Sequence, residues 1–218
     1  MKKVFIFDFD GTLYSGEDKY CKIHNFINQY KRSFLQNLTD KEYEKIIKEN
    51  PTWLQVYSGA DIVELIYSFI DKYPNYNIDI NDYRKWLLNV IEPVNIDKNQ
   101  IINPAFLKSL CENFPVYIVS NSDIVHIKHY MKEMNIDPKW FKSIISNQFI
   151  KSDRTKKHYY QDILNWENCD PKNAFVFGDS ITSDIIPAEK LGINAFRITD
   201  STKIASIVQD IIKNFKFA

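Results

Sequence analysis

A run of four apolar residues that ends in two carboxylates is the feature that most constrains this chain. Val4 to Phe7 form the run, and Asp8 and Asp10 follow it with one phenylalanine between them. Continuous apolar runs of this kind are typical of strands that helices cover on both faces of a parallel sheet. Two carboxylates held so close repel each other, and burial would cost each of them solvation. The pair therefore indicates a compensating cation.

The rest of the chain alternates buried strands with helices. Short apolar runs predict five strands, at residues 3–7, 116–119, 143–145, 174–177 and 195–198. Amphipathic segments predict helices at residues 104–112, 124–134, 156–166, 183–190 and 204–213. Alternation of this kind implies a parallel sheet with right-handed crossovers. We therefore expect an α/β fold whose core is a doubly wound, Rossmann-like sheet.

One long interval breaks this alternation. Between about residue 15 and residue 100 no strand pattern appears, whereas several stretches place apolar residues at the i, i+3, i+4 spacings of a helix. Pro51 and Pro74 end two of these stretches. We predict an all-helical domain at residues 16–100, inserted after the first strand. The α/β core would then consist of residues 1–15 and 101–218.

Bulk composition argues against several functional classes. The 218 residues include 28 Lys plus Arg and 28 Asp plus Glu, so the net charge is zero, which gives no general attraction for nucleic acid or an anionic membrane. No stretch approaches membrane-spanning length, and the first apolar run is too short for a signal peptide. Three widely spaced cysteines argue against a disulfide framework. We expect a cytoplasmic protein, either a monomer or a homodimer.

Polar residues follow two further strands at the edge where a doubly wound sheet binds ligands. Ser120 and Asn121 follow the strand at 116–119, and the sequence Gly178-Asp179-Ser180 follows the strand at 174–177. Asp184 comes five residues after Asp179. Because the carboxyl ends of parallel strands meet at one edge of the sheet, we expect these side chains to lie near Asp8.

The aspartates form a candidate metal site. Asp8, Asp10 and Asp179, with Asp184 close behind, would make an oxygen-rich pocket that suits Mg²⁺ better than a soft metal. The four histidines stand in no metal-ligand pattern. We expect the helical face shared by His126 and His129 to be solvated.

A magnesium site of this kind usually also holds a substrate phosphate. The Ser120 hydroxyl can donate to a phosphoryl oxygen, and the backbone N–H groups of Asp10 and Gly11 can cradle another. Asn121 can orient the phosphate or its neighbours. The basic stretch KSDRTKKH, at residues 151–158, opens the helix before the fourth strand. One of its lysines would offset the charge of Asp8, although some of these charges simply solvate the start of the helix.

Taken together, these motifs resemble the four motifs of the haloacid dehalogenase (HAD) superfamily. The matching segments are DFDGT at residues 8–12, Val119-Ser120, a helix-opening lysine, and GDSITSD at residues 178–184. They occur in the family's order, each at a strand end or a helix start. The resemblance covers residues 1–15 and 101–218. The predicted insert lies between the first two motifs, where its position is similar to that of the family's helical cap.

The resemblance implies a role for each aspartate. Asp8 would be the nucleophile that forms an aspartyl-phosphate, and Asp10 would act first as general acid and then as general base. Mg²⁺ would be held by the Asp8 carboxylate, the backbone carbonyl of Asp10 and Asp179. Asp184 would support the ion through water or an indirect contact, or it could cap the helix that follows. Dehalogenating members of the family lack the second aspartate of the first motif, so Asp10 favours phosphoryl chemistry.

The resemblance also implies a catalytic lysine, for which the basic stretch offers three candidates. Lys156 is preferred because it opens the helix and has the spacing to Asp179 that is typical of one family pattern. Lys157 lies about 100° further around that helix, and Lys151 lies in the loop before it. We expect Thr12 to stabilise the turn behind Asp10.

The leading hypothesis is a Mg²⁺-dependent phosphatase that acts on a small phosphorylated metabolite. A phosphomutase of the same superfamily is the alternative, and it would return the phosphoryl group to a sugar rather than to water. A non-catalytic HAD-like binding protein is a third hypothesis. Its expected signature is the loss of a motif aspartate, and every motif aspartate is present. Fold alone does not identify the substrate, and nucleotides, sugar phosphates and a phosphorylated cofactor precursor are all candidates.

Overall fold

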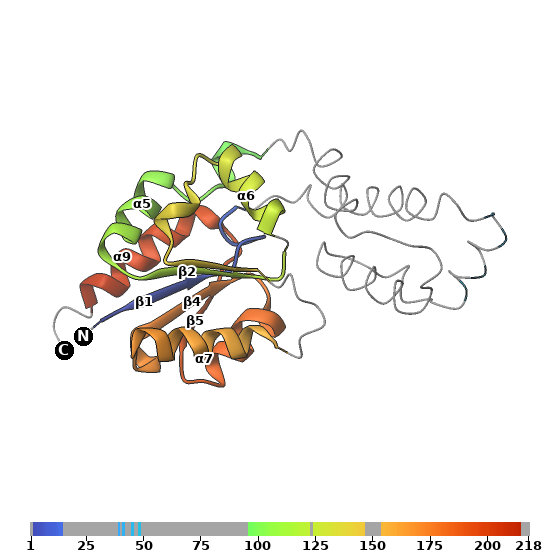
Figure 1. Ribbon diagram of the computed structural model, residues 1–218. Coiled ribbons are helices and arrows are strands. Elements are labelled where there is room, and N and C mark those ends of the chain that lie inside the picture. The colour runs from blue at the N-terminus through green and yellow to red at the C-terminus, as the bar shows by residue number, and fades with distance from the viewer. Residues whose placement is uncertain are drawn as a thin grey trace. The chain divides into compact units, whose positions relative to one another are not determined.

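The computed structural model describes residues 2–14, 39, 41, 45, 48, 96–122, 124–146 and 154–214. Two compact units divide the chain, one made of Met1–Gly16 and Val94–Ala218, the other of Glu17–Pro93. The predicted helical insert at residues 16–100 falls almost entirely outside the described residues, so its helical character stays a prediction. The strands and helices with defined bounds all belong to the first unit, and Figure 1 draws them in colour.

A five-stranded parallel sheet forms the centre of this unit. The strands are β1 (Val4–Phe7), β2 (Val116–Ser120), β3 (Ser143–Ser146), β4 (Ala174–Gly178) and β5 (Asn194–Arg197). Their order across the sheet is β3-β2-β1-β4-β5, and Phe7 of β1 lies between Ile118 of β2 and Phe177 of β4. The α/β class expected from the sequence is confirmed. The strand order reverses at β1, and doubly wound sheets bind ligands at this kind of switch point.

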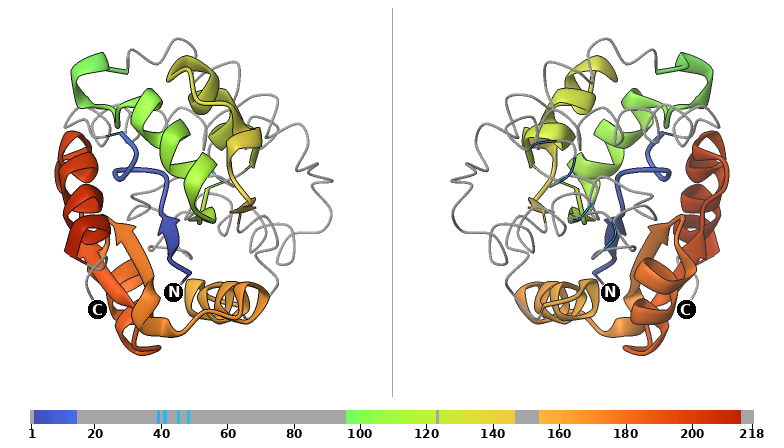
Figure 2. Two further views of the ribbon diagram at one scale, coloured as in Figure 1. Left: turned by 90° about the vertical axis from the view of Figure 1, so that its left-hand side faces the viewer. Right: turned by 90° about the vertical axis from the view of Figure 1, so that its right-hand side faces the viewer.

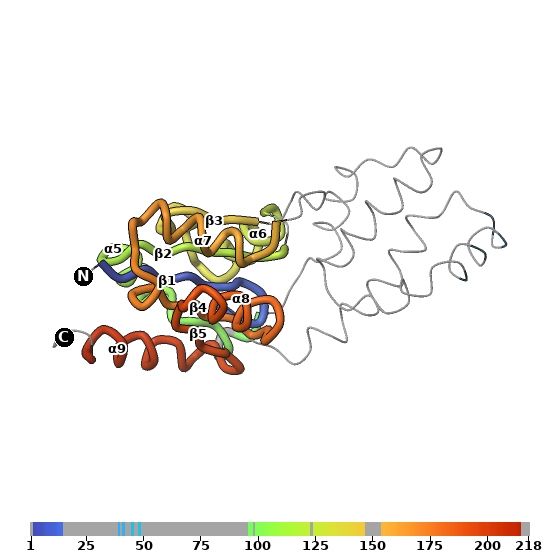
Figure 3. The backbone as a smooth tube through the Cα atoms, turned by 90° about the horizontal axis from the view of Figure 1, so that it is seen from below, coloured from blue at the N-terminus to red at the C-terminus, as the bar shows by residue number. Residues whose placement is uncertain are grey.

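Helices cover both faces of the sheet. They are α5 (Pro104–Asn113), α6 (Ile124–Glu133), α7 (Lys156–Glu167), α8 (Ile186–Glu189) and α9 (Ile204–Asn214). Figures 1 and 2 show α5, α6 and α9 on one face and α7 on the opposite face, and Figure 3 shows α8 beside α7. Aspartate or asparagine side chains cap α5 and four short 3₁₀ turns, namely Lys98–Gln100, Pro138–Trp140, Pro171–Asn173 and Ser201–Lys203.

The apolar strands are continuous because both of their faces are buried. Every residue of β1, β2 and β4 is buried. Val4 and Ile6 pack into the cluster that includes Tyr160 and Ile163 of α7. On the other face, aromatic rings run across the sheet, with Phe7 stacked on Phe177 at 4.8 Å between ring centroids. This packing fixes the carboxyl ends of β1 and β4 relative to each other.

Each predicted strand ends within one residue of the observed bounds, as do four of the five predicted helices. The helix predicted at residues 183–190 is present, but it consists of two consecutive segments of different type. A π-helical turn (Ile181–Ile185) precedes the short helix α8. Pro187 lies in the first turn of α8, and because it has no N–H it cannot make the regular α-helical hydrogen bond to the residue four positions upstream. Within the described ranges, no helix is both long enough and apolar enough to cross a membrane.

Candidate active site

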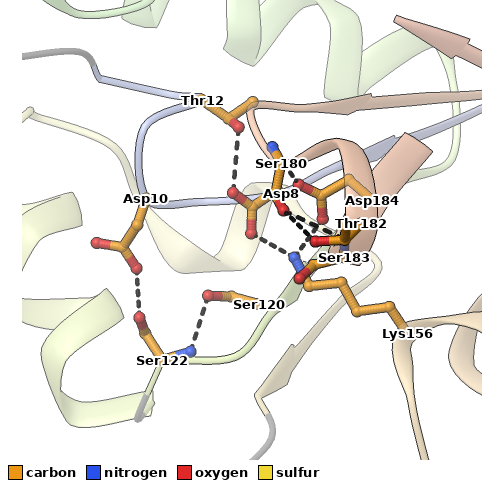
Figure 4. Close-up of polar contacts among 10 residues, drawn as sticks. All are labelled: Asp8, Asp10, Thr12, Ser120, Ser122, Lys156, Ser180, Thr182, Ser183 and Asp184. Carbon is orange, nitrogen blue, oxygen red and sulfur yellow. Dashed lines mark hydrogen bonds and ion pairs between the residues drawn. The ribbon is translucent and has the colours of Figure 1, made fainter. Parts of the chain in front are cut away.

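The carboxyl ends of β1, β2 and β4 bring the predicted polar side chains together (Figure 4). Asp8 follows β1 directly, Ser120 is the last residue of β2, and Asp179 follows β4. The backbone N–H of Asp8 donates to the carbonyl of Phe177 at 2.8 Å. Parallel pairing therefore continues up to the residue that carries the first carboxylate, which holds this part of the site rigid.

A buried lysine bridges two of the carboxylates. Lys156 Nζ lies 2.7 Å from Asp8 Oδ1 and 2.5 Å from Asp184 Oδ1. The residues Asp8 and Lys156 are each 6% exposed and Asp184 is fully buried. Burial alone would lower the pKa of Lys156, but the charges of Asp8 and Asp184 outweigh it and raise that pKa above its usual value. Lys156 is therefore a fixed positive charge at the end of β1.

The start of α7 positions this lysine. Thr155 is the N-cap residue, and its backbone N–H donates to His158 Nδ1 at 3.0 Å in a capping box. The helix therefore begins at Lys156, whose side chain reaches into the site. Lys157, the next candidate, is exposed. Lys151 lies outside the described residues.

Asp8 is both buried and hydrogen-bonded. Burial raises the pKa of its carboxyl to about 6, although the Lys156 charge acts in the opposite direction. The Thr12 hydroxyl donates to Asp8 Oδ2 at 3.1 Å. We expected Thr12 to stabilise the turn behind Asp10, and its backbone N–H does donate to the Phe9 carbonyl at 3.3 Å. Its side chain, however, hydrogen-bonds to Asp8 and not to the turn.

Three carboxylates converge in a cluster that fits a hard cation. Asp8, Asp179 and Asp184 each offer one carboxylate oxygen, and these oxygens lie within 4.8 Å of one another. Two glycines leave the space that the carboxylates fill. A Cβ at Gly11, whose φ is +78°, would lie 2.8 Å from Asp179 Cγ, and one at Gly178 would lie 2.5 Å from Asp184 Oδ2. An all-oxygen set of this charge suits Mg²⁺.

Asp184 has contacts that set it apart from the other two. Its Oδ1 accepts from Lys156, and its Oδ2 accepts from the backbone N–H of Ser180 at 3.0 Å. The N-cap of the turn after β4 is Ser180, whose side chain accepts from the Ser183 N–H at 3.2 Å. Asp184 is therefore not the cap. It joins Lys156 to the loop that carries Asp179.

The Asp10 side chain lies apart from this acidic cluster. Figure 4 shows its carboxylate turned toward Ser122. Its Oδ2 accepts a hydrogen bond from the Ser122 hydroxyl, while its Oδ1 accepts from the Tyr14 hydroxyl and lies 3.0 Å from His126 Nε2. We expected the Asp10 carboxylate in the metal pocket, whereas the carboxylates that cluster among the described residues are those of Asp8, Asp179 and Asp184. The contribution that the family resemblance implies for Asp10 is through its backbone carbonyl, and that contribution stays a prediction.

Sequence reasoning missed Ser122, and for His126 it was wrong. We expected the His126 face of α6 to be solvated, yet this side chain is only 14% exposed and contacts Asp10. The reason is its position in the first turn of α6, which begins close to the end of β2 and lies over the site. That position was visible in the sequence as the third residue of the predicted helix.

The predicted phosphate-binding residues lie close to these groups. Ser120 is 3% exposed, and its Oγ accepts from the Ser122 backbone N–H at 3.0 Å. A hydroxyl that accepts this bond keeps its own proton for another acceptor, such as a phosphoryl oxygen. Asn121 is half-buried beside it, and Gly11 is half-buried in the turn after β1.

A family model described as haloacid dehalogenase-like hydrolase matches residues 2–192 of the chain. No curated protein sequence matches it. A HAD phosphatase from Thermococcus onnurineus has a similar structure, with 18% identity, a TM-score of 0.62, and coverage of 97% of this chain and 98% of that one.

Two further structures show the same fold. A 2-haloacid dehalogenase from Pseudomonas syringae is 13% identical with a TM-score of 0.55, covering 97% of this chain and 100% of that one. A HAD family enzyme from Bacteroides thetaiotaomicron, solved with magnesium and inorganic phosphate, is 18% identical with a TM-score of 0.51, covering 95% and 99%. At such low identity these likenesses establish the fold alone.

Proposed function

The chain belongs to the haloacid dehalogenase-like hydrolases, and we propose that it is a Mg²⁺-dependent phosphatase of small phosphorylated metabolites. One observation carries the proposal. The buried Asp8 carboxylate contacts a fixed lysine charge at 2.7 Å and lies in one cluster with the carboxylates of Asp179 and Asp184. The Asp8 carboxylate would have to approach an anionic phosphate while other carboxylates lie close by. The repulsion between these negative charges has to be offset by cations, which would be Lys156 and Mg²⁺.

In the proposed reaction Asp8 is the nucleophile. Its carboxylate attacks phosphorus, the bond from phosphorus to the leaving oxygen breaks, and an aspartyl-phosphate and an alcohol result. Water then attacks the same phosphorus, which releases inorganic phosphate and restores the carboxylate. Hydrogen bonds from Lys156 and Thr12 support this role, since they hold the Asp8 side chain in one orientation.

Asp10 would move the protons in both steps. It would protonate the leaving oxygen in the first step and take a proton from the attacking water in the second. Lys156 and Ser120 would bind the phosphoryl oxygens, with Asn121 and the backbone of Gly11 at the sides. Mg²⁺, held by Asp8, Asp179 and the Asp10 carbonyl and supported by Asp184, would neutralise the phosphoryl charge and orient it for in-line attack.

Asp10 favours a phosphatase over a dehalogenase, although a dehalogenase shares the fold. A halide leaves as a stable anion and needs no proton, whereas an alkoxide leaves readily only when an acid protonates it. A chain with a second carboxylate two residues after Asp8, held by hydrogen bonds from Tyr14 and Ser122, is equipped for the second kind of leaving group.

We also propose a type of substrate, a location and an oligomeric state for this enzyme. We infer a small substrate rather than a polymer, because a net charge of zero gives the chain no general attraction for nucleic acid. We infer a cytoplasmic location, because Cys111 and Cys169 are free thiols. A monomer or a homodimer is expected.

A phosphate-release screen over a metabolite panel tests the proposal, with Mg²⁺ present and then chelated. Release is expected only with the metal, and Asp8→Asn should abolish it while the circular dichroism spectrum stays native. Asp210→Asn, an exposed position on α9, is the matched control and should retain full activity. An Asp8→Asn protein as active as the wild type would end the proposal. Conserved total organic phosphate with a sugar phosphate would indicate a phosphomutase instead.

A further inference from the structure

The Asp10 carboxylate has hydrogen-bond partners from three separate segments of the chain. Tyr14 comes from the turn after β1, Ser122 from the turn after β2, and His126 from α6. An ionised carboxylate only accepts hydrogen bonds. Whenever Asp10 is ionised, the 3.0 Å contact between His126 Nε2 and Asp10 Oδ1 is a hydrogen bond only if Nε2 carries the proton.

The His126 ring is itself held in place. Its centroid lies 4.3 Å from that of Tyr130, and the edge-on ring of Phe9 lies 6.4 Å away. Tyr14 also packs against Tyr130, at 5.2 Å. These rings form an aromatic cluster, and because they pack on one another the imidazole has little freedom to turn away from Asp10.

Both phenols of the cluster stay protonated. Burial raises the pKa of Tyr14, and the Asp10 charge raises it further. Burial and the same charge raise the pKa of Tyr130. The Tyr14 hydroxyl therefore remains a donor to Asp10, and neither tyrosine adds a second negative charge near it.

The orientation of Asp10 is linked to the predicted phosphate contact. Ser122 donates its hydroxyl to Asp10 Oδ2 and its backbone N–H to Ser120 Oγ at 3.0 Å. Ser122 thus links the Asp10 carboxylate to the Ser120 hydroxyl, which is expected to bind the phosphoryl group. A change in the direction of Asp10 would alter its distance to the leaving oxygen, and proton transfer depends steeply on that distance.

We propose that His126 is a positioning residue for Asp10, whose Nε2–H keeps the Asp10 carboxylate aimed at the leaving oxygen of the substrate. His126 need not touch the substrate itself. The inference deepens the proposed function and rests on it, since Asp10 must be the general acid for its aim to matter. Loss of this positioning should slow the reaction most when the leaving group is poor, because poor leaving groups depend most on acid catalysis.

His126→Phe is the informative variant, since it keeps a ring against Tyr130 and removes the Nε2–H donor. The ratio kcat/KM reports on phosphoryl transfer to Asp8, and we would measure it with 4-nitrophenyl phosphate and with phenyl phosphate. We expect a loss of about 30-fold with phenyl phosphate and of less than about 3-fold with 4-nitrophenyl phosphate. The first figure is smaller than the roughly 100-fold or more that a general acid contributes, because Asp10 would be misdirected and not removed. His126→Gln, whose amide N–H can replace Nε2–H, should recover most of the phenyl phosphate activity.

Two controls separate positioning from a merely structural role. Lys128→Ala changes an exposed side chain on the same helix and should leave both esters unaffected. In an Asp10→Asn background, His126→Phe should add less than about a 2-fold loss with phenyl phosphate, because coupled residues are not additive.

The outcomes are distinct. Equal losses on the two esters, no loss on either, or full additivity with Asp10→Asn would overturn the inference while the wild type remained an active phosphatase. A wild type that releases phosphate from neither ester would overturn the proposed function and this inference with it.

Discussion

The ammonium group of Lys156 lies 2.7 Å from the Asp8 carboxylate and 2.5 Å from that of Asp184, with all three side chains buried. The lysine is the first residue of α7, while the two aspartates lie beyond the ends of β1 and β4. A charge that is buried away from water is strongly destabilising unless an opposite charge pairs with it. Removing one member should therefore affect the stability of the whole unit as well as its chemistry.

Lys156→Met should lower the free energy of unfolding by about 3 to 5 kcal/mol at pH 8, because it leaves two carboxylates buried without their cation. The loss should be smaller at pH 5. The unpaired carboxylates would have raised pKa values, so protonation at acid pH removes their charge. Urea denaturation at both pH values measures this. Lys157→Met, the exposed neighbour, should change the free energy by less than about 0.5 kcal/mol, and equal losses in the two variants would contradict the pairing.

Gly11→Ala should impair metal binding and stability together. The backbone at Gly11 has φ +78°, and a Cβ there would lie 2.8 Å from Asp179 Cγ. We expect a stability loss of at least about 1 kcal/mol from the backbone alone and a Mg²⁺ affinity at least about tenfold weaker, measured by calorimetry, if Asp179 has to move.

Gly192→Ala is the matched control for this substitution. Gly192 has nearly the same φ, +76°, but a Cβ there would meet only the Pro171 Cβ at 3.7 Å. It should show the backbone cost and unchanged Mg²⁺ affinity. Weaker Mg²⁺ binding in both variants would argue against a specific fit between Gly11 and Asp179.

Mg²⁺ binding should weaken as the pH falls through about 6. Burial raises the pKa of Asp8 to about 6 in the metal-free protein, so below that pH the cation must displace a proton. Below pH 6 we expect the Mg²⁺ affinity to fall by up to roughly tenfold for each pH unit, because one proton competes with the ion. Titration calorimetry in buffers of different ionisation enthalpy should detect proton release near pH 6. An affinity that does not change between pH 5 and pH 7 would exclude Asp8 as a titrating ligand.

Asp179→Asn and Asp184→Asn should have different effects. Both oxygens of the fully buried Asp184 accept hydrogen bonds, from Lys156 and from the Ser180 N–H. Its replacement should therefore mainly reduce the free energy of unfolding, by about 2 kcal/mol or more. Asp179→Asn should mainly reduce Mg²⁺ affinity. Thermal denaturation and calorimetry on both variants would show the contrast, and a reversed ranking would mean that the roles of the two aspartates are exchanged.

Local pattern was sufficient for most of the α/β unit that the structure describes. The apolar runs that became β1 and β4 needed no long-range information, because a strand buried on both faces has to be apolar throughout. The start of α7 was predicted from the amphipathic stretch alone, and the structure adds that Thr155 is its N-cap residue. The π-helical turn before α8 was not foreseen, because Pro187 marks where a helix is interrupted and says little about how the chain accommodates it.

The convergence of Asp8, Ser120 and Asp179 also followed from sequence, because parallel strands place their carboxyl ends at one edge of the sheet. The geometry around Asp10 did not follow from the sequence. Its contacts with Ser122 and His126 depend on how the first turn of α6 lies over the end of β2, and no periodicity in either segment encodes that.

The sequence by itself thus determined which residues carry charge and which strand end each occupies, since both depend only on composition and short-range spacing. Tertiary structure decided which charges touch. It brought Lys156 to Asp8 and Asp184, it turned Asp10 toward His126, and it made Thr12 a partner of Asp8. The reason is that hydrogen bonds form over about 3 Å, so they depend on how helices pack across a sheet, which neighbouring residues in the sequence do not specify.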